Sequence, residues 1–140
     1  MKYLWPLRDE PKPVYPLIAS VDPTDVGLRG EFSAAVLELN KEQNIEYISS
    51  ASFINPDIER KLIKSSLYSA VIDWLKYLGV AEDISSRDLG KLGHELKVVL
   101  SEGGKAHDLT HVGVGVSQVF PILVMSLLAN PDTTLIFEQP

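Results

Sequence analysis

The chain has 140 residues, of which 45% are hydrophobic and 23% charged, and its formal net charge is −6 at pH 7. These values fit one globular domain of ordinary soluble composition and exclude a wholly disordered chain. The absence of cysteine excludes a disulfide framework and any thiolate metal site, and a reducing, cytoplasmic location is expected. The acidic balance argues against a broad nucleic-acid footprint, because phosphate binding needs clustered Lys and Arg.

The first part of the chain is rich in proline. Six of the nine prolines fall within the first 56 residues, and each removes a backbone donor and fixes φ. We expect residues 1–28 to be mostly extended or irregular. The N-terminus has no apolar h-region, so a secretion signal is not supported.

Apolar periodicity predicts two helices in the next part of the chain. Residues 29–39 carry apolar side chains at three- and four-residue spacing, which favours a short helix. Residues 45–48 are typical of a strand. Asn55 followed by Pro56 resembles a helix start, and an apolar stripe continues to a stop at Gly79, so we expect a helix of about six turns over 55–79. The charged residues 59–64 are interpreted as its solvated face.

The C-terminal part is predicted to hold a hairpin, a helix and a strand. Residues 94–112 favour a β-hairpin that turns at Gly103 and Gly104. A glycine-rich loop, residues 113–118, then leads into the apolar run Val119–Ala129. At about half of the ~20 residues that a membrane span needs, this run is interpreted as a core helix. Residues 133–137 are predicted to form a buried strand.

The end of the chain carries the most specific arrangement of chemical groups. Glu138 follows an apolar strand, as a carboxylate that helps to hold Mg²⁺ at a nucleotide site would. Gly113 and Gly115 permit close backbone approach, and Ser117 is placed where a helix N-terminus could meet an anion. The alternatives are a polar residue that merely ends a strand and a helix cap at Ser117.

Taken together, residues 112–118 and 135–140 (VGVGVSQ and LIFEQP) resemble the signature and Walker B segments of prokaryotic AAA/ABC-class ATPases related to the OLD and SMC groups, which carry GxGxSQ and EQP-type motifs. Residues 3–8 (YLWPLR) and 25–31 (DVGLRGE) are similar to the YxGPLR and DVGxRGE segments of that family. The resemblance covers both ends of the chain. It implies an α/β fragment of a P-loop NTPase: a single partial domain with a signature helix and a Walker B strand.

The resemblance also implies roles for individual residues. Gly113, Gly115, Ser117 and Gln118 would contact the γ-phosphate of ATP held by a second ATPase subunit. Glu138 would hold the water bound to Mg²⁺. Gln139 stands where many relatives have the catalytic glutamate, and a neutral amide can position a water but cannot accept its proton.

No phosphate-binding loop of the form GxxxxGK[ST] occurs in the sequence. We therefore expect a fragment whose P-loop lobe lies elsewhere in a parent protein, together with an effector nuclease or DNA as further partners. The competing hypotheses are a non-catalytic interaction module and a degenerate domain that binds nucleotide without cleaving it.

Several other residues have alternative interpretations. The histidines His94, His107 and His111 lack a metal-site motif and are interpreted as surface or capping groups. Trp5, Trp74 and Tyr77 are expected in the core. Arg8 and Arg29 could clamp a phosphate or pair with Asp25 or Glu31, with pairing preferred.

Overall fold

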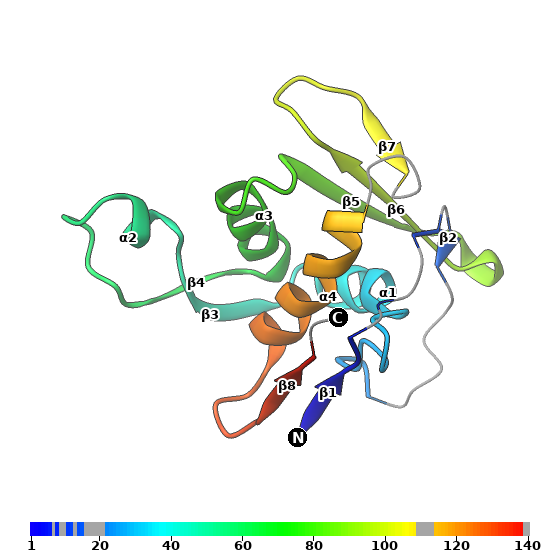
Figure 1. The fold of residues 1–140 in the computed structure, drawn as a ribbon, viewed down its shortest axis with the longest axis horizontal. Coiled ribbons are helices and arrows are strands. Elements are labelled where there is room, and N and C mark those ends of the chain that lie inside the picture. The colour runs from blue at the N-terminus through cyan, green and yellow to red at the C-terminus, as the bar shows by residue number, and fades with distance from the viewer. Residues whose placement is uncertain (7, 9–10, 13, 16–21, 109–113, 139–140) are drawn as a thin grey trace.

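The computed structural model describes residues 1–6, 8, 11–12, 14–15, 22–108 and 114–138, and it shows a mixed α/β chain (Figure 1). The described helices are α1 (Ser33–Asn40), α2 (Ala51–Ile54), α3 (Leu67–Tyr77), α4 (Val114–Leu128) and a short 3-10 helix (Gly90–Leu92). The described strands are β1 (Lys2–Leu4), β2 (Val14–Tyr15), β3 (Asn44–Ile48), β4 (Leu62–Ser66), β5 (Asp83–Asp88), β6 (His94–Val99), β7 (Ala106–Asp108) and β8 (Leu135–Phe137).

The largest sheet is antiparallel and is centred on β6. Strand β5 pairs with β6 along its whole length, and β2 and β7 pair with different halves of β6. The predicted hairpin is confirmed where the structure describes it, since Val99 lies opposite Ala106 and Gly103 adopts a φ of 71° in the turn. Residues 109–112 of that prediction lie outside the described part. Strand β5 was not predicted from the sequence.

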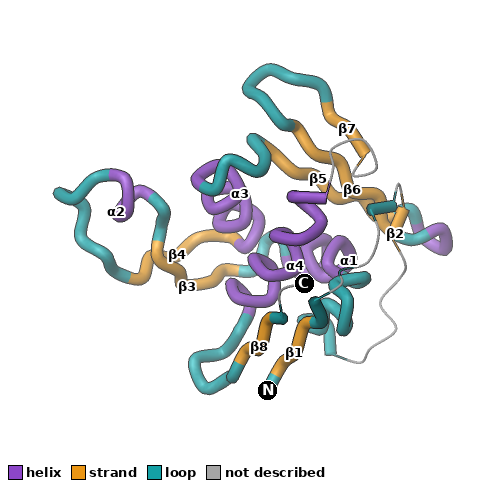
Figure 2. Tube along the Cα trace, in the orientation of Figure 1, coloured by secondary structure: helices purple, strands orange, loops and turns teal. Residues whose placement is uncertain are grey.

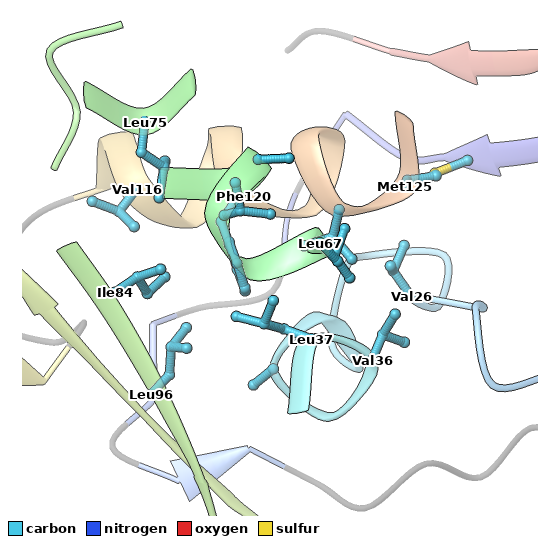
Figure 3. Packing of buried hydrophobic residues seen from close by; sticks show 14 of the residues in the cluster. Val26, Val36, Leu37, Leu67, Leu75, Ile84, Leu96, Val116, Phe120 and Met125 are labelled. Carbon is cyan, nitrogen blue, oxygen red and sulfur yellow. The ribbon is translucent and has the colours of Figure 1, made fainter. Parts of the chain in front are cut away.

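Helices α1, α3 and α4 share one hydrophobic core with the inner face of this sheet. The inward side chains of β6 alternate with half-exposed ones, as expected for a sheet covered on one face. Figure 3 shows Val116 and Phe120 of α4 with Leu75 of α3, Leu37 of α1 and neighbouring sheet residues in this core. The apolar run, predicted as a core helix over Val119–Ala129, belongs to a core helix up to Leu128.

No helix in the described ranges has the length and apolar character needed to cross a membrane.

The predicted helix over 55–79 is wrong in its first half. Asn55 accepts a hydrogen bond from the backbone N–H of Asp57 (2.9 Å), which forms a local turn rather than a helix cap. Strand β4 then pairs antiparallel with β3, which confirms the predicted strand at 45–48. Only α3 is helical: the Ser66 side chain caps it, and Gly79 follows its last turn with a φ of 67°. The charged residues 59–64 are exposed, but on a loop and strand.

Residues 44–66, here called the arm, extend from the rest of the molecule (Figure 2). The arm contacts α3 through aromatic rings: the ring centroid of Phe53 lies 5.6 Å from that of Trp74 and 6.4 Å from that of Tyr77. The expectation of core aromatics is wrong for Tyr77, which is 43% exposed, and for Trp5, which is 47% exposed. Both stand at the ends of their elements, beyond the buried positions.

Candidate functional site at the end of strands β1 and β8

Strands β1 and β8 join the two ends of the described chain in a parallel pair. Leu4 lies opposite Phe137, the backbone N–H of Lys2 donates to the carbonyl of Thr134 (2.8 Å), and that of Glu138 donates to Leu4 (3.1 Å). The predicted strand at 133–137 is confirmed over Leu135–Phe137, but it is half-buried rather than buried. Because parallel strands end at the same edge, Glu138 lies beside the end of β1.

The Glu138 side chain is exposed at this edge and has a partner on β1. The Tyr3 phenol forms a hydrogen bond with Glu138, and this bond, together with a smaller effect of burial, raises the pKa of Tyr3 above its usual value. Tyr3 is therefore a protonated donor at neutral pH. The Tyr3 phenol therefore lies near the Glu138 carboxylate, which is exposed at this edge.

Arg8 lies against the backbone at the end of β8. Its side chain is only 5% exposed, and both terminal nitrogens, Nη1 and Nη2, point at the carbonyl oxygen of Glu138 at 3.4 Å. Its Nε is buried and has no hydrogen-bond partner. Burial lowers the pKa of Arg8 from its usual value, because the guanidinium has been removed from water.

The preferred pairing of Arg8 with Asp25 or Glu31 is wrong. The Asp25 carboxylate accepts a hydrogen bond from the backbone N–H of Gly27 (2.9 Å), and the Glu31 carboxylate accepts one from the backbone N–H of Arg29 (2.8 Å). Both acids therefore stabilise turns within their own segment.

The start of α4 differs from the sequence prediction. The helix begins at Val114, so Gly115 lies within its first turn instead of in a preceding loop, and Ser117 is not the N-cap. A side chain at Gly115 would meet nothing within 4 Å, and the glycine has no positive φ, whereas Ser117 is 7% exposed and Gln118 is half-buried. Gly113 and Gln139 lie outside the described residues.

Residues 25–31 fold against the first half of α4. Gly30 adopts a φ of 79°, and a Cβ there would lie 2.5 Å from Cγ of Pro121. Arg29, Gly30 and Ser117 line the same small cavity. The segments 25–31 and 113–118, which carry separate family-like motifs, thus lie side by side where described.

Two groups of candidate residues result. Ser117 belongs with residues 25–31, and Glu138 belongs with Tyr3 and Arg8. The chain reverses direction between α4 and β8 (Figure 1), which separates the contacts of the signature segment from those of Glu138.

The histidines do not gather at this site. His94 is buried on β6, which corrects its interpretation as a surface group, and its Nδ1 has no hydrogen-bond partner. His107 is exposed on β7, and His111 lies outside the described residues. Within the described ranges, no group of three or more His, Cys, Asp or Glu side chains could hold a metal ion.

One polar cluster was missed from the sequence. Asp73 on α3 accepts hydrogen bonds from Tyr47 Oη (2.9 Å), Ser49 Oγ (3.1 Å) and both the backbone N–H and the hydroxyl of Ser50. The only sequence signal was the Ser49-Ser50 pair directly after a strand. The cluster fastens the arm to α3.

No family model, curated protein or solved structure matches this chain. The described helices and strands define a mixed α/β protein.

Proposed function

We propose that this chain is part of an ABC-class, P-loop-type ATPase and supplies the Walker B strand and the signature helix to a Mg-ATP site between two subunits. The observation that carries the proposal is the parallel β1–β8 pair, which delivers the exposed Glu138 carboxylate at its carboxyl edge. Ligands of open α/β sheets bind outside the carboxyl ends of parallel strands. The phosphate-binding loop would come from another lobe of the parent protein.

In this proposal Glu138 holds a water bound to Mg²⁺. A carboxylate oxygen is a ligand type suited to Mg²⁺, and the Mg²⁺ would neutralise charge that develops on the phosphates. Tyr3 orients the carboxylate through its hydrogen bond. Gln139 would position the attacking water, and hydrolysis is slow unless another carboxylate accepts the proton.

The N-terminus of α4 would meet the γ-phosphate held by a second subunit. The first N–H groups of a helix lack internal partners and carry partial positive charge. Gly115 is open to an approaching ligand, and Gln118 lies one turn further along. Ser117 is buried, so its contact with phosphate requires a local change of conformation.

The parent protein would couple ATP binding to dimerisation and to an effector, either a nuclease or a DNA-binding part. The burial of Ser117 favours one rival function, a non-catalytic interaction module in which the start of α4 serves packing alone. The other rival function is that of a degenerate domain, which binds nucleotide without cleaving it.

Phosphate release at saturating Mg-ATP, measured on the complete protein with its P-loop lobe, tests the proposal. We expect Glu138→Ala to abolish turnover, because loss of the anion misplaces the metal and the phosphates together. Gln139→Glu should leave nucleotide binding intact and should not lower turnover. Glu102→Ala, at an exposed position between β6 and β7, is the matched control.

If Glu138→Ala retains parental turnover, Glu138 is not a Walker B residue and the ATPase proposal fails. The chain alone should show no ATPase activity and only weak nucleotide affinity, because it has no phosphate-binding loop. Calorimetry that gives micromolar or tighter ATP binding to the chain alone would contradict this expectation.

A further inference from the structure

Arg8 is a buried charge that has no counter-ion among the residues that the structure describes. None of the ion pairs among the described residues includes its guanidinium, and its Nε has no partner at all. Its contacts with the Glu138 carbonyl, at 3.4 Å, are longer than the roughly 2.7–3.2 Å of ordinary N–H···O bonds. Among the described residues, the Glu138 carbonyl oxygen is therefore the one hydrogen-bond acceptor found for the five N–H donors of Arg8.

The burial of the Arg8 guanidinium has a desolvation cost that these contacts do not offset. Arginine remains protonated in proteins, so a buried guanidinium cannot avoid its desolvation cost by becoming neutral. Buried charges are normally paired with an opposite charge, and an unpaired one costs several kcal/mol by order of magnitude. An anion bound at Arg8 would remove this cost.

The position of Arg8 indicates which anion fits. Its guanidinium lies at the carboxyl edge of the parallel β1–β8 pair, directly against the backbone of Glu138. The planar fork of arginine binds phosphate through two parallel hydrogen bonds. The Glu138 carboxylate interacts with Tyr3, and the described contacts of Arg8 are with the Glu138 carbonyl oxygen, so no described ion pair joins the two side chains.

We infer that Arg8 is a phosphate-binding residue, which contacts a phosphate group of the nucleotide beside Glu138. The identity of the phosphate, as part of a nucleotide, rests on the proposed function. The buried guanidinium itself requires only an oxyanion. Binding would replace the long contacts to the carbonyl with charge-assisted hydrogen bonds.

The test is arginine side-chain NMR on the complete protein. The Nε–H signal of Arg8 is assigned as the one that Arg8→Lys removes or, if this variant does not fold, by through-bond correlation to the assigned backbone of Arg8. The probes are inorganic phosphate, Mg-ADP and, at matched ionic strength, sodium chloride. We expect a saturable shift of the Arg8 signal with Mg-ADP and no comparable shift with chloride.

Arg8→Lys should weaken Mg-ADP binding by about tenfold or more, because an ammonium cannot reproduce the bidentate contact. The matched control is Arg87→Lys, since Arg87 is exposed and paired with Glu95 at 2.9 Å. An Arg8 signal that responds to neither phosphate nor Mg-ADP overturns the inference, as does an equal loss of affinity in the control. A response to inorganic phosphate alone overturns the nucleotide as its source.

Failure of this inference is distinguishable from failure of the proposed function. Hydrolysis that is lost in Glu138→Ala, with an unresponsive Arg8 signal, leaves the ATPase proposal standing and removes Arg8 from the site. A responsive Arg8 signal with unchanged hydrolysis in Glu138→Ala leaves Arg8 as a phosphate-binding residue and removes the ATPase proposal.

Discussion

At the scale of single residues, Asp73 makes the most concentrated set of hydrogen bonds described in the chain. Burial raises the pKa of this carboxyl, but the hydrogen bonds from the Ser50 hydroxyl and N–H, Tyr47 and Ser49 outweigh burial and lower the pKa below its usual value. Burial, followed by the bond to Asp73, raises the pKa of Tyr47 to about 12, so Tyr47 remains a donor at neutral pH.

We predict that Asp73→Asn destabilises the fold at neutral pH by about 2–3 kcal/mol, because hydrogen bonds to a charged acceptor are replaced by poorer ones. A carboxyl with a lowered pKa in the folded state stabilises it fully above the unfolded value of about 3.9, and this stabilisation is lost as pH falls through the folded pKa. Urea unfolding of parent and variant should therefore show a difference in free energy that shrinks below about pH 4.

Asp57→Asn, an exposed substitution on the arm, is the control and should change stability by less than about 0.5 kcal/mol. A difference between Asp73→Asn and the parent that stays constant from neutral pH down to pH 3 would show that the ionised carboxylate is not what stabilises this contact.

At the scale of elements, sequence periodicity predicted α1, α3, α4, β3, β6, β7 and β8 in type, but it misjudged residues 55–66. Leu62 and Ile63 fit the helical stripe of α3, yet they belong to β4, whose conformation depends on pairing with β3. A pattern within one segment contains no information on a partner strand, and tertiary pairing overrode it.

The same limit applies to the candidate site. The position of Glu138 at the end of a strand could be predicted, because the apolar run before it is local in sequence. The contact of Arg8 with Glu138 joins residues 130 positions apart, and the burial of Ser117 depends on residues 25–31 packing on α4. Neither long-range contact has a local signature.

The packing of residues 25–31 on α4 leads to a prediction for Gly30. Gly30→Ala places a Cβ 2.5 Å from Cγ of the rigid Pro121 ring at a φ of 79°, which only glycine adopts readily. We expect a loss of about 3 kcal/mol from backbone strain and overpacking together, measured by chemical denaturation.

Gly79→Ala separates the two causes. Gly79 has a similar φ of 67°, but its Cβ would meet nothing within 4 Å, so only backbone strain of about 1 kcal/mol applies. If the two variants lose equal stability, the contact between the 25–31 segment and α4 is not tight in solution.

At the scale of the whole molecule, the two ends of the described chain belong to one core. Leu4 on β1 is fully buried and belongs to the same cluster as Leu37 of α1, Leu75 of α3 and Leu96 of β6. The carboxyl edge that presents Glu138 therefore depends on the global fold, because β8 is anchored through β1. A site of this kind should lose its geometry only when the whole core unfolds.

We predict that Leu4→Ala destabilises the entire chain by about 3 kcal/mol, the usual cost of deleting a fully buried leucine side chain. Ile136→Ala, at a 37% exposed position on the paired strand, should cost less than about 1.5 kcal/mol. Denaturation followed by the fluorescence of single-tryptophan variants provides the measurement. Trp5 reports on the β1 edge and Trp74 on α3, so Trp74→Phe and Trp5→Phe isolate the two signals. Within each single-tryptophan protein, Leu4→Ala should lower the unfolding free energy by the same amount, because a shared core unfolds cooperatively. A loss seen from Trp5 but not from Trp74 would mean that the β1–β8 edge unfolds on its own, and that the position of Glu138 is set locally instead of by the core.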